Sequence, residues 1–234
     1  MDFGKIEAPS VKELFKERIA TMILSRQLPV GAKLPPERAL AEQMGISKTV
    51  VHSGLQELSR MGLVSIRPQS GVSVADYRVD GNLETFAAIM RFNGSILQKD
   101  TVRDILDIRL AIEGLGMRRL AESRTAADIA VLRRMIEDIG DAVASGESDM
   151  RVFAEKFFTF HKTMCSLTGS MMFPMMFNAM KEVSLDFWSL YLRHYGVGNA
   201  INRLVRFTDL IEAGDVDGAV SELKSGIDAE LLNY

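Results

Sequence analysis

The residues best suited to contact a polyanion stand together at the start of one helical segment. Ser47, Lys48 and Thr49 follow Gly45 and precede a run with helical apolar spacing. A helix N-terminus presents unpaired backbone N–H groups and favours phosphate. Lys48 adds positive charge, and the two hydroxyls can bond phosphates or base edges. Each residue alone would be an ordinary solvated side chain, but together they predict a contact surface for nucleic acid.

A thiol and an imidazole form the second chemical candidate. His161 and Cys165 are four residues apart, so both lie on one face of a helix. An imidazole can activate a thiol as a nucleophile. Catalysis also needs an orienting group and an oxyanion-stabilising loop, and the sequence displays neither. We therefore expect no enzyme, and a Cys/His enzyme is kept as the less favoured alternative.

Apolar residues and one arginine predict a ligand pocket near His161. Phe157 lies one turn before it, and methionines follow at Met164, Met171, Met172, Met175 and Met176. Methionine suits permissive pockets, although Met and Phe at helical spacing commonly form plain core. Arg109 is the charged candidate, because a guanidinium binds a carboxylate through two N–H groups. Its alternative role is an internal ion pair with Glu113, one turn away.

The elements around Ser47–Thr49 predict a winged helix-turn-helix over residues 1–75. Apolar periodicity predicts helices over residues 10–27, 37–44 and 48–61, with Ser47 capping the third. After Gly62 the apolar period becomes two, on both sides of Pro68-Gln69-Ser70-Gly71. That pattern predicts a two-stranded hairpin, the wing.

The rest of the chain predicts a mostly α fold. Residues 76–99 are expected to form a linker with a helix inside 82–92. Residues 100–234 are expected to form an all-helical antiparallel bundle that binds an effector and dimerises. Thr125 and Asp128 have the spacing of a capping box. The predicted helices of the bundle cover residues 101–122, 125–145, 150–167, 172–195, 199–213 and 216–232.

Composition and charge agree with a two-part regulator. Residues 1–75 carry 10 Lys and Arg against 7 Asp and Glu, whereas the whole chain has a net charge of −3. A basic head on an acidic body suits DNA binding by the head. The single cysteine favours a reducing compartment, and no apolar run is long enough for a membrane span. These features predict a cytoplasmic protein without membrane contact.

The stretch from Leu34 to Val50, LPPERALAEQMGISKTV, resembles the GntR family of regulators. The likeness continues through Leu55-Gln56-Glu57-Leu58, Gly62-Leu63-Val64 and Arg67-Pro68, and covers about residues 10–75. It implies that the helix starting at Ser47 enters the major groove while the hairpin tip, at Gln69, Ser70 and Gly71, reaches the minor groove. By the same analogy Arg38 lies near the DNA.

Three positions depart from that family's common pattern. Many members carry arginine where this chain has Lys48 and His52, and glycine is frequent at the position of Gln69. Lysine lacks the two-pronged contact to guanine, and an unperturbed histidine is mostly neutral at pH 7. We therefore expect an operator that differs from the family's common one. Gln69 is equally well explained as a minor-groove contact or as a plain turn residue.

Residues 100–232 resemble the FadR-like subgroup, whose helical effector domain is called FCD. The resemblance rests on Asp107-Ile108-Arg109-Leu110-Ala111-Ile112-Glu113, Leu120-Ala121, Thr125, Phe160-His161-Lys162, Gly169 and Ala213-Gly214-Asp215. It implies a metal site of one Asp and three His in many members. Here only His161 matches, because Phe157, Leu204 and Gly226 occupy the other positions.

One imidazole cannot hold a divalent cation without further ligands. We therefore expect no metal and no cofactor, unless a register shift of one turn brings Glu155 or Asp209 into the site. An apolar cavity would instead favour an effector with a sizeable apolar portion, bound by Arg109, His161, Phe157 and Leu204.

The predicted function is a ligand-responsive, sequence-specific DNA-binding transcription regulator, with repression as the expected sign. A homodimer is expected on a pseudo-palindromic operator in double-stranded DNA, since one head makes few base contacts. The alternative is a constitutive DNA-binding dimer without an effector.

Overall fold

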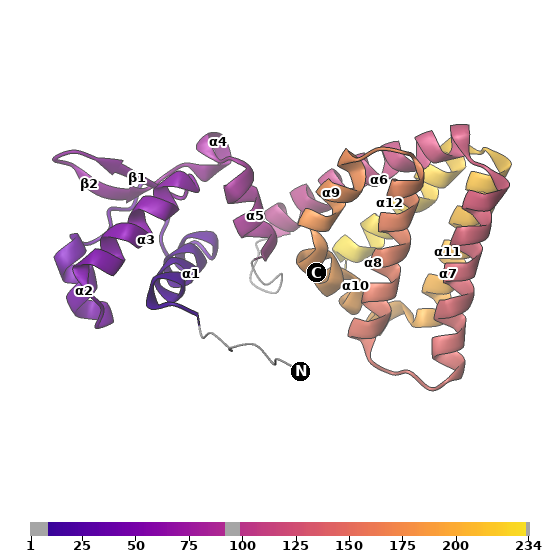
Figure 1. Ribbon diagram of the computed structural model, residues 1–234, viewed down its shortest axis with the longest axis horizontal. Coiled ribbons are helices and arrows are strands. Elements are labelled where there is room, and N and C mark those ends of the chain that lie inside the picture. Colours follow the sequence, from indigo (N-terminus) through magenta and orange to yellow (C-terminus); the bar gives the residue numbers. More distant parts are fainter. Residues whose placement is uncertain (1–8, 92–98, 233–234) are drawn as a thin grey trace, which may run out of the picture. The chain divides into compact units, whose positions relative to one another are not determined.

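The computed structural model describes residues 9–91 and 99–232. It divides into two compact units, Met1–Phe92 and Asn93–Tyr234 (Figure 1). We call the first the head and the second the body, and describe each by itself.

The head is a three-helix cluster with a two-stranded wing. Its elements are α1 (Val11–Leu24), α2 (Glu37–Met44), α3 (Lys48–Arg60), β1 (Val64–Arg67) and β2 (Gly71–Val74), followed by α4 (Tyr77–Asp80) and α5 (Leu83–Arg91). The two strands are antiparallel and pair Val64 with Val74. This arrangement confirms the predicted winged helix-turn-helix.

The head core forms where α1 crosses α3. Phe15, Ile19 and Ile23 of α1 are buried with Val51 and with other apolar residues of α3 and the wing. Gly54 allows the close crossing, since a Cβ there would overlap the Phe15 ring. The expected apolar face of the first helix is only partly buried: Val11 and Leu14 are each 51% exposed.

The segment after the wing is tied to the end of α3. The side-chain amide of Asn82 donates to the Arg60 carbonyl at 2.9 Å, and the Thr85 hydroxyl donates to the Met61 carbonyl. The helix predicted inside residues 82–92 is present as α5. Residues 92–98 of the predicted linker lie outside the described residues.

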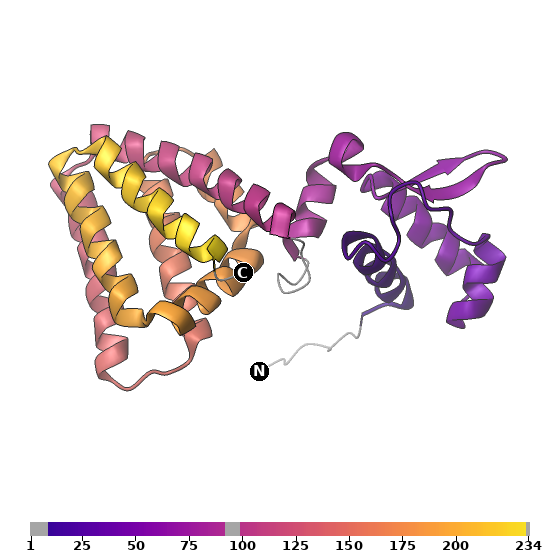
Figure 2. The same cartoon turned by 180° about the vertical axis from the view of Figure 1, so that it is seen from behind.

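The body is a bundle of helices in which α6 and α12 lie side by side (Figure 2). Its elements are α6 (Lys99–Ser123), α7 (Ala126–Ala144), α8 (Met150–Leu167), α9 (Met172–Ala179), α10 (Lys181–Tyr195), α11 (Val197–Ala213) and α12 (Val216–Leu232). Thr125 and Asp128 form the predicted capping box on α7. The mostly α fold with a helical C-terminal unit is therefore confirmed.

One predicted helix of the body is wrong. Residues 172–195 form two helices, α9 and α10, separated at Met180. The break buries both Phe177 and Met180 completely. Phe177 stacks on Phe158 of α8 with ring centroids 4.9 Å apart. A straight helix would carry these two side chains along one line, so packing on α8 overrides the local helical pattern.

Within the described residues, the helices are too short or too polar for any of them to cross a membrane.

Candidate DNA-binding surface and effector pocket

The N-terminus of α3 presents the predicted trio to solvent. Ser47, Lys48 and Thr49 are all exposed. The Ser47 hydroxyl accepts from the Val50 backbone N–H at 3.3 Å, so it caps the helix as expected. No acidic residue lies in the first turn of α3. The positive end of the helix dipole and Lys48 therefore act together on any approaching phosphate.

Arg38 and His52 extend this surface through neighbouring helices. Arg38 is 88% exposed in its side chain and lies 3.0 Å from Glu42. An ion pair this exposed contributes little and can be exchanged for phosphate. His52 Nδ1 lies 2.7 Å from the Glu37 carboxylate. Because a carboxylate only accepts, Nδ1 carries the proton, and Nε2 of the neutral ring is left as an acceptor.

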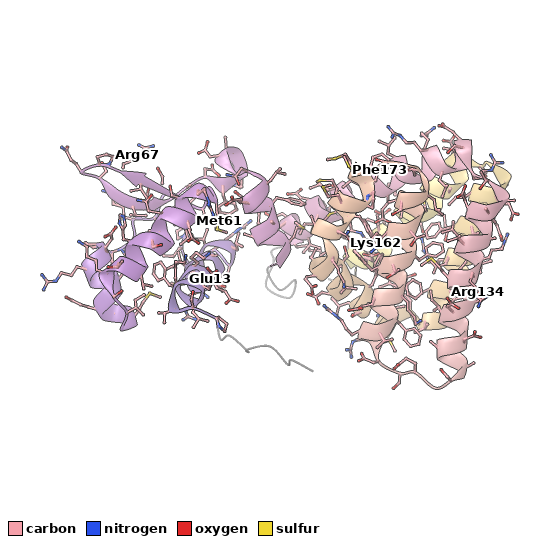
Figure 3. All side chains as sticks on the ribbon, in the orientation of Figure 1. Glu13, Met61, Arg67, Arg134, Lys162 and Phe173 are labelled. Atoms are coloured by element: carbon pink, nitrogen blue, oxygen red, sulfur yellow. The ribbon has the colours of Figure 1, made fainter. Side chains whose placement is uncertain are left out.

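The wing tip has a left-handed turn. Gln69 has φ +65° and Gly71 has φ +82°, and the Ser70 N–H donates to the Arg67 carbonyl at 3.2 Å. Left-handed backbone explains why glycine would suit position 69, since a residue with a Cβ incurs about 1–2 kcal/mol there. Gln69, Ser70 and Gly71 are exposed. Arg67, which the sequence analysis did not single out, is also exposed beside this turn (Figure 3).

Two lysines of α1 hold α3 in place through one carboxylate. Lys12 Nζ lies 2.7 Å and Lys16 Nζ 2.5 Å from Glu57. The Lys12 hydrogen bond, followed by that of Lys16, lowers the pKa of Glu57 to about 2. These ion pairs fix the α3 helix, and hence its exposed face, against the rest of the head.

The body contains a small cavity lined by α6, α8, α10, α11 and α12. Its volume is about 30 Å³, which is room for about two water molecules. Arg109, Phe157, His161 and Leu204, the four residues expected to bind an effector, all line it. The structure thus brings the four together from three helices, and their role in binding stays a prediction.

Arg109 is buried at the wall of this cavity between two carboxylates. Its Nε lies 2.9 Å from Glu113, and its Nη1 lies 2.6 Å from Glu230. Its guanidinium also lies 4.7 Å from the Trp188 ring centroid. Burial alone would lower the pKa of Arg109, but the charges of Glu230 and Glu113 raise it overall. Arg109 is therefore a fixed cation, and the internal ion pair with Glu113 is present.

Glu113 also orients His161. His161 Nδ1 lies 2.5 Å from the second oxygen of Glu113. Burial alone would raise the pKa of Glu113, but Arg109 and His161 lower it overall, so the carboxylate accepts and Nδ1 donates. The sequence analysis missed this orienting group. It does not activate Cys165, which is fully buried, does not line the cavity and has a pKa raised by burial.

The positions of the subgroup's metal ligands meet at the same cavity but do not fit a metal. Phe157, His161, Leu204 and Gly226 all line it, and only His161 can coordinate. A Cβ at Gly226 would lie 2.6 Å from Arg203 Nη2, so a cationic group takes the space of a ligand side chain there. Within residues 9–91 and 99–232, no group of three or more His, Cys, Asp or Glu is arranged to hold a metal.

Four further cavity residues were not expected from the sequence. They are Trp188, Tyr191, Arg203 and Glu230. They come from α10, α11 and α12, and each has the spacing of an ordinary amphipathic helix position. No local pattern marks them, because their common property is a meeting point in space.

Comparison with known proteins assigns both units. Residues 12–74 match the gntR family of bacterial regulatory proteins, and residues 104–229 match the FCD domain. The chain belongs to the GntR family. It is a DNA-binding transcription regulator with an FCD effector-binding domain, as the sequence predicted.

Several regulators are similar to this GntR protein. The HTH-type transcriptional regulator Mce2R of Mycobacterium tuberculosis is 31% identical over 172 residues, which is 74% of this chain and 69% of Mce2R. LutR of Bacillus subtilis is 26% identical over 70% of this chain and 71% of its own. The fatty acid metabolism regulator protein of Klebsiella pneumoniae is 25% identical over 81% of this chain and 74% of its own.

Solved structures show the same fold. Lar of Listeria monocytogenes has a TM-score of 0.59 at 13% identity, covering 97% of this chain and 98% of Lar. Streptococcus agalactiae GntR has a TM-score of 0.50 at 18% identity, covering 96% of this chain and 100% of that one. At these identities the likeness shows the fold alone.

Proposed function

We propose that this GntR regulator binds a pseudo-palindromic operator as a homodimer and responds to a small molecule held in the body cavity. Residues 1–75 are the proposed DNA-binding domain, and residues 100–234 are the proposed effector and dimerisation domain. The observation that carries the proposal is the α3 N-terminus, where Lys48 and two hydroxyls are exposed on a turn without acidic residues. Repression is the proposed sign and the cytoplasm the proposed location.

In the proposed complex α3 lies in the major groove with Lys48, Thr49 and His52 toward the bases. Nε2 of a neutral His52 accepts a hydrogen bond, so it suits the amino groups of adenine or cytosine. Arginine at the same position would donate to guanine instead. Glu37 therefore tunes base preference through the tautomer of His52. The wing residues Gln69, Ser70 and Gly71 contact the minor groove.

The test is selection of double-stranded DNA from a random library, followed by light scattering of the protein with and without the selected site. We expect two half-sites with two-fold symmetry and a mass of two chains in both samples. A monomer in both samples, or selected sites without symmetry, would contradict the dimer. His52→Arg should shift the selected base toward guanine, and an unchanged preference would remove His52 from the contact.

The cavity of the body is proposed to hold an effector with an apolar portion and no metal. Protein purified without a chelator or an affinity tag should contain far less than one equivalent of zinc, nickel or manganese. One equivalent per chain that disappears in His161→Ala would refute this part. The constitutive alternative predicts that a screen of metabolites changes neither thermal stability nor operator binding.

A further inference from the structure

The two carboxylates bound to Arg109 are held very differently. Glu113 lies on the same helix as Arg109, one turn away, and its second oxygen accepts from His161. Glu230 comes from α12, two residues before that helix ends at Leu232. Among the described residues, Arg109 is its only hydrogen-bond donor. Glu230 is thus a carboxylate placed on the cavity's arginine from a distant part of the sequence.

We propose that the effector is a carboxylic acid with an apolar remainder, and that its carboxylate replaces that of Glu230 on Arg109. This inference rests on the proposed effector function of the cavity and names the chemistry of the ligand. Glu230 then serves as an internal substitute that occupies the acid-binding position of the empty regulator.

The charge balance of the cluster favours an exchange over a simple addition. Arg109 already faces two carboxylates, so a third anion would bury an uncompensated negative charge, which is strongly unfavourable. If Glu230 turns into solvent as the acid binds, the number of carboxylates on Arg109 stays at two. The ligand then needs no new cation, and the flat face of Arg109 stays on Trp188, 4.7 Å away.

Glu230 is also the carboxylate that leaves more easily. Burial raises its pKa, and Arg109 only partly offsets that effect. The pKa of Glu113 is lowered overall by Arg109 and His161 despite its burial. The ionised form is therefore less favourable at Glu230 than at Glu113. Its place in the last turn of α12 lets it reach solvent without unpacking the middle of that helix.

The size and walls of the cavity support the same exchange. About 30 Å³ cannot hold an organic acid, so some side chain must move when the effector enters. Withdrawal of Glu230 clears the space next to Arg109. The remaining walls at Phe157, Leu204, Phe207 and Ile227 are apolar, which suits a hydrocarbon remainder rather than a second charged group.

Trp188 supplies a direct readout, because it is the only tryptophan in the chain and lines the cavity. The full-length protein is titrated with hexanoate, hexanamide and hexylamine, which share a six-carbon chain and differ in the charge of the head group. Trp188 fluorescence and calorimetry should report saturable hexanoate binding. Hexanamide and hexylamine should bind at least about tenfold more weakly, since neither pairs with a guanidinium as a carboxylate does.

The deciding variant is Glu230→Gln, which removes the competing charge while keeping the side-chain size. It should bind hexanoate about fivefold to tenfold more tightly than the unaltered protein, because the internal competitor is weakened. The matched control is Asp228→Asn on the same helix, where the carboxylate is exposed and pairs with Lys224. This control should leave hexanoate affinity unchanged.

The outcomes separate the exchange from the effector function itself. Equal hexanoate affinity in Glu230→Gln and the unaltered protein overturns the exchange but leaves a ligand site. Preferred binding of hexylamine or hexanamide overturns the carboxylate class and again leaves a ligand site. Failure of all three probes overturns this inference, and the metabolite screen then decides separately whether the cavity binds any effector.

Discussion

The head and the body treat their polar residues in opposite ways. All eight residues expected to contact DNA, from Arg38 to Gly71, are exposed. In the body, Arg109 and Glu113 are 1% and 0% exposed, and Glu230 and His161 are also buried. The head therefore offers donors and charge that any phosphate can reach, whereas the body has already paired its charges with one another.

This difference sets how each region can recognise a partner. An exposed cation exchanges water and counterions for phosphate, so binding depends on salt and needs no rearrangement of the head. A buried, neutralised cluster accepts a ligand only if the ligand replaces an internal partner or leaves the charge balance unchanged. Recognition by the head is governed by addition of contacts, and recognition by the body by exchange of contacts.

The largest expected effect breaks the exposed surface of the head. Lys48→Ala and Arg38→Ala should each weaken operator binding by about 1–3 kcal/mol if they contact base edges. If they contact phosphates, each should instead lower the slope of log affinity against log salt by about one. Fluorescence anisotropy with the selected operator at several salt concentrations measures both quantities.

Arg134→Ala is the matched control in the body, since Arg134 is exposed on α7 and pairs with Asp138 (Figure 3). It removes the same charge at a place with no proposed DNA contact, so operator affinity should stay within error. If the double variant of Lys48 and Arg38 binds as tightly as the Arg134 control, the DNA-binding assignment is wrong.

The same contrast explains what the sequence could predict. Ser47, Lys48 and Thr49 are consecutive, and the hairpin tip is one short turn, so local spacing alone placed them. The cavity residues Arg109, Trp188 and Glu230 are far apart along the chain. Arg109 was identified with Glu113 because they are one turn apart, whereas its second partner, Glu230, depends on how α12 packs on α6. The break at Met180 escaped prediction for the same reason, since packing on α8 produces it.

A smaller effect compares one substitution in the two regions. Gly54→Ala should destabilise the head by about 1–2 kcal/mol, because the new Cβ overlaps the Phe15 ring and exceeds the gain in helix propensity. Gly140→Ala on α7 meets no atom within 4 Å and should stabilise the body by about 0.5–1 kcal/mol. Amide hydrogen exchange resolved by peptide assigns each change to its unit. Equal protection of head peptides in Gly54→Ala and the unaltered protein would show that Phe15 moves aside freely.

The smallest expected effect concerns acid and again differs between the regions. The pKa of Glu57 is about 2 in the folded head, against a reference value of 4.5, chiefly because Lys12 and Lys16 donate to it. A carboxylate with a lowered folded pKa stabilises the head fully above about pH 4.5, and that contribution is lost as the pH falls toward 2. Glu230 has the opposite sign, because its raised pKa makes its contribution greatest at low pH and smaller as the pH rises through its folded value. Hydrogen exchange of α1 and α3 peptides between pH 6 and pH 3, corrected for the intrinsic exchange rate, should therefore show the head opening more readily on acidification. Glu57→Gln should flatten that trend while lowering head stability at neutral pH by at most about 1 kcal/mol, since the pairs are partly exposed. A pH trend that persists unchanged in Glu57→Gln would assign the acid sensitivity of the head to other carboxylates.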